Sequence, residues 1–188
     1  MTPAIRHISI LALAILLQTN GYGQTTKPVR QDTVMQQQPA PNRQSFWDSL
    51  PKPKGWINDY EGLYSDNEEL VLDSLVHLLK NETGIEIAVV TIDAVSIPKE
   101  KFVELTQRMA NQWGVGEAGK DNGILVGISR GHRMIRINNG SGIEKLITDE
   151  ETKEIIDSYF IPYFKDGEFY KGTIVGLTEL IQRLQAKR

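Results

Sequence analysis

Two apolar runs rich in β-branched residues constrain the fold of this chain more than any other feature. Residues 85–92 (IEIAVVTI) and 123–129 (GILVGIS) carry a single charge between them, and such runs are typical of strands buried on both faces of a sheet. The intervening residues 98–113 place apolar side chains at helical spacing. A strand, a helix and a second strand predict two parallel strands joined by a right-handed crossover.

The segments around this unit predict further helices and one more strand. Capping boxes at 65–68 and 148–151 mark the starts of helices that end near residues 83 and 164, and a last helix is expected over about 168–187. Residues 133–138 alternate as a strand, and the short connection makes that strand antiparallel to the preceding one. We therefore expect an α/β fold, a three-layer α/β/α sandwich with a mixed central sheet and helices on both faces.

The first 23 residues have the features of a signal peptide. Arg6 precedes an apolar run at 8–17 that is too short to cross a bilayer, and Gly21 and Gly23 fit the small residues before a cleavage site. We expect cleavage before Gln24 and a periplasmic or secreted protein with no integral membrane span in its mature form. The alternative is an uncleaved membrane anchor.

The rest of the chain divides into a linker and one domain. Residues 24–54 are rich in Gln and Pro and poor in apolar side chains, so we expect a disordered linker. Phe46, Trp47 and Leu50 interrupt this polar segment, and loose docking of these side chains on the domain is the alternative for this stretch. Residues 55–188 contain all the predicted helices and strands and are long enough for a single core.

Composition excludes several classes of function. The chain has no cysteine, which excludes disulfides, thiolate catalysis, Cys-ligated zinc and a lipidated N-terminal cysteine. The formal net charge is −3, with acidic and basic residues interspersed. The sequence therefore shows no cluster of basic residues of the kind that binds nucleic acid.

A glycine-rich loop at 113–123 (WGVGEAGKDNG) raises the question of phosphate binding. Its G-x-G-x-x-G pattern follows a predicted helix and leads into a strand, the reverse of the order in a dinucleotide-binding motif. The negative end of the helix dipole therefore faces the loop and favours a cation. Asp121 and Asn122 add oxygen ligands of the kind that calcium accepts, whereas the alternative is a plain turn into the strand.

Several motifs in order resemble the TPM domain family, which includes a plant thylakoid-lumen acid phosphatase and many exported bacterial proteins. The resemblance covers about residues 55–184. The motifs that carry it are Asn58-Asp59, Gly62-Leu63, residues 83–91, residues 113–123, residues 133–137, residues 140–144 and residues 146–149.

The resemblance implies an α/β/α sandwich with an acidic cluster at one end of the sheet that binds calcium. The positions that match this cluster are Asp59, Asp121 and Glu144, with Asn122 beside them. Members of the family are linked to weak phosphatase activity or to binding roles near membranes. The expected cofactor is therefore calcium, and Asp59, Asp121, Asn122 and Glu144 are the expected metal ligands.

Three positions depart from the family pattern. His132 stands where an acidic residue is usual before the arginine-containing strand, Ser141 replaces a common aromatic, and Lys145 replaces a common glycine. These changes place positive charge beside the expected acidic cluster. They weaken a direct transfer of activity from other members of the family.

The same residues supply two hypotheses for function. The first is a calcium-binding interaction module of the cell envelope with an unknown protein partner. The second is a slow metal-dependent acid phosphatase, in which Asp59 or Asp121 acts as nucleophile or holds a metal-bound water. Arg133 and Arg136 are the arginines that could stabilise phosphoryl charge, and strand alternation allows at most one of them to serve the site. Arg136 is the catalytic candidate, and its alternative role is a solvated charge on an edge strand.

Overall fold

The computed structural model describes residues 45–187. The predicted signal peptide and residues 24–44 of the predicted linker lie outside the described residues.

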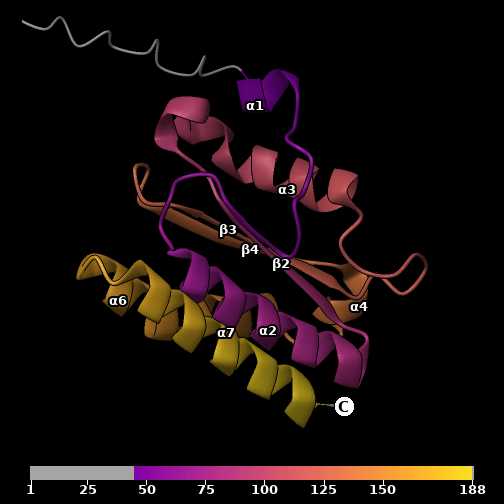
Figure 1. Ribbon diagram of the computed structural model, residues 1–188. Helices are drawn as coiled ribbons and strands as arrows, with labels where there is room; N and C mark the ends of the chain where they lie inside the picture. Colours follow the sequence, from indigo (N-terminus) through magenta and orange to yellow (C-terminus); the bar gives the residue numbers. More distant parts are fainter. Residues whose placement is uncertain (1–44, 188) are drawn as a thin grey trace, which may run out of the picture. The chain divides into compact units, whose positions relative to one another are not determined.

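A four-stranded mixed sheet forms the centre of the domain (Figure 1). The strands are β1 (Ile57–Asp59), β2 (Glu86–Thr91), β3 (Gly123–Ser129) and β4 (Met134–Asn139), in the order β1-β2-β3-β4. The first three are parallel and β4 is antiparallel to β3. The prediction of a mixed sheet is confirmed, but β1 was not predicted. This strand has three residues, one of them Asn58, and is too short to show a hydrophobic periodicity in the sequence.

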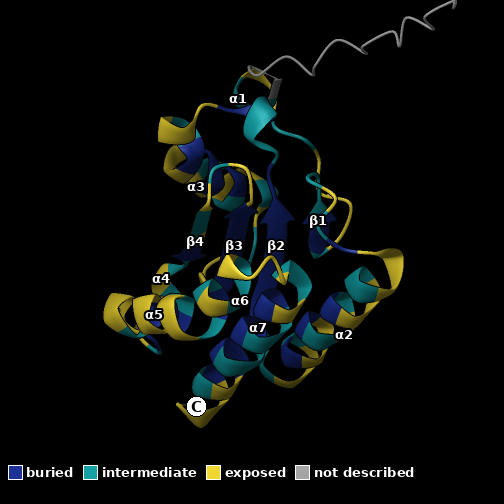
Figure 2. Ribbon diagram, turned by 90° about the vertical axis from the view of Figure 1, so that its left-hand side faces the viewer, coloured by how far each residue is buried: buried dark blue, intermediate teal, exposed yellow. Residues whose placement is uncertain are grey.

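Helices cover both faces of the sheet (Figure 1), which confirms the predicted three layers. The helices α2 (Asp66–Thr83) and α7 (Phe169–Ala186) lie on one face, and α3 (Phe102–Trp113) lies on the other. The shorter helical segments are α1 (Ser45–Asp48), the 3-10 turns Ala94–Ser96 and Lys99–Lys101, α4 (Ser141–Glu144), α5 (Asp149–Ile155), the π-helical turn Ile156–Phe160 and α6 (Ile161–Lys165). In Figure 2 the strands β2 and β3 are buried along their whole length.

Strand alternation divides the buried side chains into two cores. Ile87 and Val89 of β2 pack towards α2 and α7, whereas Val90 packs towards α3. Because successive strand residues point to opposite faces, a strand between two helical layers must be apolar throughout. This requirement explains the continuous apolar runs in the sequence.

Part of the predicted linker is ordered and packs on α3. Phe46, Trp47 and Leu50 are partly buried against the α3 core, and the carbonyl oxygen of Trp47 accepts a hydrogen bond of 3.0 Å from Nη1 of Arg108. Trp113 Nε1 donates to the carbonyl oxygen of Pro51 at 2.9 Å. The linker prediction is therefore wrong for residues 45–54, because their few apolar side chains find a complementary surface on α3.

The two crossovers leave the sheet on opposite faces. The connection from β1 to β2 passes through α2, and the connection from β2 to β3 passes through α3. Both advance in the same direction across the sheet, so the two crossovers have opposite hands. The loop after β1 therefore leads to α2 on one face of the sheet, and the loop after β2 leads to α3 on the other.

The ends of the strands define two edges of the sheet. The carboxyl edge is where β1, β2 and β3 end, at Asp59, Thr91 and Ser129. The amino edge is where β3 begins, at Gly123, and where β4 ends, at Asn139. Within residues 45–187 no helix has the length and apolar character needed to span a membrane.

Candidate functional site

The structure places the predicted acidic residues at opposite edges of the sheet. Asp59 ends β1 at the carboxyl edge, whereas Asp121 lies two residues before the start of β3 at the amino edge. Glu144 lies in α4, which follows β4 and shares the amino edge with Asp121. The prediction that all three converge is wrong, because Asp59 follows a strand and Asp121 precedes a parallel one.

No cluster of three or more metal-ligating side chains replaces the predicted one. Among residues 45–187, no group of three His, Cys, Asp or Glu side chains is placed to hold a metal ion. Any cation site in this part of the chain must therefore use at most two carboxylates and take its other ligands from amide, hydroxyl or carbonyl oxygens.

Asp59 is engaged by groups of the fold itself. Its Oδ2 accepts a hydrogen bond of 2.8 Å from the backbone N–H of Tyr64, and its Oδ1 accepts one from the hydroxyl of Thr91. Thr91 is buried and in turn accepts from the backbone N–H of Glu61 at 2.9 Å. Asp59 thus holds the turn between β1 and α2 against the end of β2.

Glu61 is a buried carboxylate that the sequence reasoning missed. Its side chain is 3% exposed, and it accepts hydrogen bonds from the backbone N–H groups of Arg130 at 2.8 Å and Gly131 at 2.9 Å. Burial raises the pKa of Glu61 above its ordinary value, although these two hydrogen bonds oppose the rise. A single glutamate in a polar loop gives no sequence signal of this role in anchoring the β3–β4 turn.

At the amino edge, Asn122 organises the glycine-rich loop. Its Oδ1 accepts from the backbone N–H of Glu117 at 2.8 Å, and its Nδ2 donates to the carbonyl oxygen of Gly84 at 2.7 Å. Glu86 binds the same loop, since its Oε2 accepts from the N–H of Gly116 at 2.8 Å. Asn122 therefore shapes the loop, and its side-chain oxygen is already used.

Asp121 pins the glycine-rich loop to the start of α4. It has a left-handed backbone (φ 49°), and its Oδ2 accepts a hydrogen bond of 2.9 Å from the hydroxyl of Ser141. A Cβ added at Gly140 would lie 2.2 Å from the carbonyl oxygen of Asp121, and one at Gly142 would lie 2.2 Å from that of Lys120. The two glycines are required because the backbones approach so closely.

A cavity of about 520 Å³, the amino-edge pocket, opens between the C-terminal end of α3, the glycine-rich loop and α4. None of its lining residues is a lysine, arginine or histidine. Asn139 also lines the pocket, and its buried Oδ1 has no hydrogen-bond partner among the described residues. The side chains in the lining that carry oxygen are Gln107, Asn111, Glu117, Asp121, Asn138, Asn139 and Ser141.

Arg136 and Glu144 are not among the lining residues, although Arg136 contacts one of them, Asn138. Arg136 is exposed and lies in the middle of β4, where it pairs with Gly127, and its Nε donates to Oδ1 of Asn138 at 3.4 Å. Glu144 is exposed in α4. Arg136 therefore does not lie beside Asp59 at the carboxyl edge, as a shared catalytic role would require.

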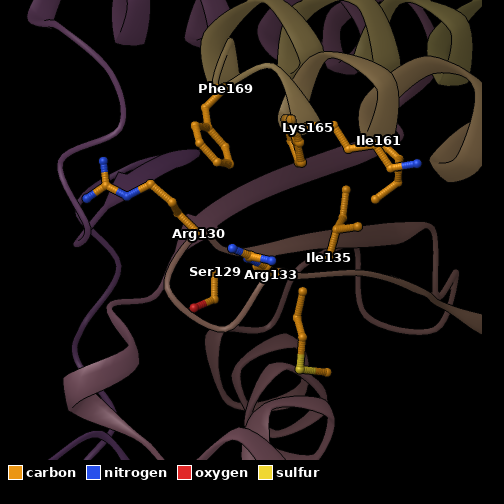
Figure 3. A pocket seen from close by; sticks show the side chains of 10 residues that line it. Ser129, Arg130, Arg133, Ile135, Ile161, Lys165 and Phe169 are labelled. Atoms are coloured by element: carbon orange, nitrogen blue, oxygen red, sulfur yellow. The ribbon is translucent and has the colours of Figure 1, made fainter.

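A second cavity, the carboxyl-edge pocket, has a volume of about 530 Å³ (Figure 3). It lies between the β3–β4 turn and the segment from α6 to the start of α7. Its lining includes Arg130, Arg133 and Lys165 together with apolar residues. His132, in the same turn, is held elsewhere, since its Nε2 lies 2.8 Å from the carbonyl oxygen of Ile97.

Three solved structures resemble this fold. The N-terminal domain of a protein from P. gingivalis is 28% identical, with a TM-score of 0.63 over 77% of this chain and 88% of that chain. The BA42 protein from Bizionia argentinensis is 17% identical, with a TM-score of 0.59 over 68% and 86% of the two chains. The N-terminal domain of the cg2496 protein from Corynebacterium glutamicum is 14% identical, with a TM-score of 0.50 over 75% and 85%.

The two structures of lower identity show the fold alone. No curated protein matches the chain. The family model of the TPM domain matches residues 57–183, which span the sheet and the helices on both of its faces. The chain therefore belongs to the TPM domain family.

Proposed function

We propose that this protein is an exported, calcium-binding interaction module of the cell envelope, and that calcium binds in the amino-edge pocket. The observation that carries the proposal is the lining of that pocket, which combines carboxylate, amide and hydroxyl oxygens with no cationic side chain. Calcium takes six to eight oxygen ligands in flexible geometry. The donor set therefore fits calcium, with Asp121 and Glu117 as the carboxylates.

The electrostatics of the amino edge also favour a cation. The 12-residue helix α3 ends at the pocket, where Gly114 caps it in a left-handed conformation, and a helix C-terminus carries partial negative charge. A hydrogen bond from Lys120 lowers the pKa of Glu117 below its ordinary value. This ion pair of 2.7 Å offsets the charge of Glu117, so Asp121 is the carboxylate in the lining that has no ion pair among the described residues.

The structure changes the ligand set that the sequence suggested. Asp59 lies at the other edge of the sheet, and the oxygen of Asn122 is already bonded to the loop backbone. We propose Asp121 as the central ligand, with Glu117 as the second carboxylate and Glu144 as an exposed neighbour at the same edge. Asn139 supplies a buried oxygen that lacks a partner among the described residues.

Support for an interaction role comes from exposed apolar side chains on α2. Leu70 is 65% exposed, Leu78 is 56% exposed and Val71 is 48% exposed. Leu70 and Leu78 are separated by about two helical turns and therefore share one face of the helix. Large apolar residues gathered on an outer helix face are typical of surfaces that contact other proteins.

The phosphatase hypothesis receives no comparable support. A phosphatase that uses an aspartate needs positive charge close to the same phosphoryl group. Asp121 lies at the amino edge, whereas Arg130 and Arg133 line the pocket at the carboxyl edge. Asp59 shares the carboxyl edge, but both of its carboxylate oxygens already accept hydrogen bonds from the fold.

Calorimetric titration with calcium chloride tests the metal proposal. We expect saturable binding by the parent protein, and binding at least about tenfold weaker in Asp121→Asn, because a carboxylate ligand loses its charge. Asp59→Asn and Glu100→Gln are the controls and should keep the parent affinity. Absence of calcium binding in the parent, or unchanged affinity in Asp121→Asn, would contradict the proposal.

Export is tested separately from metal binding. Protein recovered from the periplasm or the medium should have an intact mass that corresponds to a chain beginning at Gln24, because Gly21 and Gly23 fit the signal peptidase. A mass that includes residues 8–17 would show that the apolar run is retained as an anchor.

A further inference from the structure

We infer that the carboxyl-edge pocket is a second ligand site, which binds an amphipathic organic anion with an acidic head and a hydrocarbon or aromatic body. The cavity of about 530 Å³ falls within the range of small-molecule sites. It lies at the carboxyl edge of the sheet, and α/β proteins bind ligands outside the carboxyl ends of their strands. This site is separate from the calcium site, which lies at the opposite edge.

Three cations line the pocket, and two of them have no acidic partner among the described residues, since only Arg130 is paired, with Glu61. The side chains of Arg133 and Lys165 have no ion pair or hydrogen bond with any described residue. Arg130 lies with its Nε 3.8 Å from Oε1 of Glu61, whose two oxygens already accept backbone N–H groups. Most other cations on this domain have partners, for example Lys80 with Glu86 at 2.8 Å and Arg183 with Glu154 at 3.0 Å.

Like charges that share one cavity repel, and a bound anion relieves that repulsion. Guanidinium groups recognise carboxylate and phosphate oxygens through paired hydrogen bonds, and an ammonium group adds a point charge. Arg133 and Lys165, the two unpaired cations, supply one group of each kind. The chemistry of the pocket rim therefore selects an acidic head group.

The backbone conformation of the turn holds one of these cations at the pocket. Arg133 has φ 54°, a left-handed conformation that glycine usually fills. Its N–H donates to the carbonyl oxygen of Arg130 at 3.0 Å, which closes the turn. A glycine would fit this position with less strain, so the arginine carries a conformational cost that a binding role would explain.

The walls of the pocket are apolar and only partly covered. Ile135, Phe164 and Phe169 pack against the core but remain partly exposed, and the rings of Phe164 and Phe169 have centroids 5.0 Å apart. Figure 3 shows Phe169, Ile161 and Ile135 around the same space as Lys165. An inorganic anion would leave these side chains in contact with water, whereas a ligand with an apolar body would cover them.

The N-terminal part of this chain does not match the pocket. Residues 24–44 contain three basic residues (Lys27, Arg30 and Arg43) and one acidic residue (Asp32). A segment of net positive charge is repelled by three cations. The expected occupant is therefore a separate molecule, with either a carboxylate or a phosphate as its head.

The test is titration of the folded mature chain with eight-carbon probes, followed by calorimetry and by backbone amide chemical shifts. Octanoate and octyl phosphate represent the two heads; octanol supplies the body alone, and acetate and inorganic phosphate supply the heads alone. We expect saturable shifts at residues 130–135 and 161–169 with octanoate or octyl phosphate. Whichever of these two binds more tightly identifies the preferred head group. Octanol, acetate and inorganic phosphate should each bind at least about tenfold more weakly than that probe.

Variants distinguish recognition of the acidic head group from nonspecific hydrophobic binding. Arg133→Gly removes one cation while suiting the left-handed backbone, so the fold is retained, and Lys165→Gln removes another. Each should weaken binding of the better probe by about tenfold, whereas the control Lys99→Gln, an exposed lysine outside the pocket, should not. The inference is overturned if neither anion binds, if octanol or a free head binds as tightly, or if Arg133→Gly keeps the parent affinity.

Discussion

Asp59 shows that a carboxylate at the end of a strand can be fully used by the fold. Its two oxygens accept from the backbone of Tyr64 and from the hydroxyl of Thr91. Asp121, by contrast, is exposed, and its carboxylate accepts only from the hydroxyl of Ser141 among the described residues. The two aspartates, which look equivalent in the sequence, therefore differ in how much folding depends on them.

Substitution of the two aspartates should separate these roles. Asp59→Asn retains one acceptor atom and loses the other together with the charge, so we expect a loss of about 1–3 kcal/mol in the free energy of unfolding. Asp121→Asn keeps an oxygen that can accept from Ser141, and we expect a change within about 0.5 kcal/mol in the absence of calcium. Urea unfolding measures both, and a larger loss in Asp121→Asn would reverse this assignment.

Glu61 predicts a pH dependence of stability. Burial raises the pKa of this carboxyl in the folded state, so folding favours the protonated form. Its contribution to stability is therefore complete below the ordinary carboxyl pKa and is lost as the pH rises through the raised value. Compared with Glu61→Gln, the parent should lose stability as the pH rises from the ordinary carboxyl pKa through the raised one.

The measurement is the difference between the free energies of unfolding of the parent and Glu61→Gln at several pH values. Because other titrating groups are common to both proteins, the difference isolates Glu61. A difference that stays constant, or that grows in favour of the parent as the pH rises, would show that the folded state favours the ionised form.

At the scale of elements, the segment from α5 to α6 differs from an ordinary helix by its π-helical turn. The turn Ile156–Phe160 ends with the fully buried Phe160, which packs against α7 where Gly176 leaves room. A Cβ added at Gly176 would lie 2.1 Å from the ring of Phe160. The glycine in the middle of α7 is thus explained by this contact, despite its low helix propensity.

Gly176→Ala should therefore destabilise the protein, although alanine favours helices. Overpacking a filled core costs about 1–3 kcal/mol, which exceeds the gain of about 1 kcal/mol in helix propensity. Thermal and urea unfolding measure the effect, and the second change Phe160→Leu should recover part of it by making room. An Ala variant as stable as the parent would show that the α7 contact relaxes without cost.

At the scale of the whole molecule, the fold is easier to predict from the sequence than the candidate site. Residues 85–92 and 123–129 are buried on both faces of the sheet, so their apolar runs are strong signals. β1 has only three residues and includes Asn58 and Asp59, so it leaves no period to detect. Without β1 the edge that Asp59 occupies is unknown, and its assignment to the same site as Asp121 follows from that gap.

Contacts that depend on the tertiary fold are also invisible in the sequence. Lys165 is far in the chain from Arg130 and Arg133, and the three line one pocket only because the β3–β4 turn lies beside α6. The N-terminal boundary of the domain also depends on tertiary contacts that the sequence does not show. Phe46 and Trp47 look like interruptions of a polar linker, yet they cover α3.

Trp47 tests how far the folded domain extends into the predicted linker. Its ring lies under Lys101 at 4.3 Å and Arg108 at 4.5 Å, measured to the ring centroid, and it is partly buried against the α3 core. Burial of an aromatic ring together with cation–π contacts contributes about 1–3 kcal/mol. Trp47→Ala should lower the free energy of unfolding by that amount, whereas the exposed neighbour Asp48→Ala should change it by less than about 0.5 kcal/mol. Equal stabilities of Trp47→Ala and the parent would mean that residues 45–54 add nothing to folding, as expected of a true linker. A loss of stability in Trp47→Ala but not in Asp48→Ala would instead show that this segment unfolds together with the domain. In a two-state transition, a contact contributes to the free energy of unfolding of the whole domain only if it is formed in the native state and lost on unfolding.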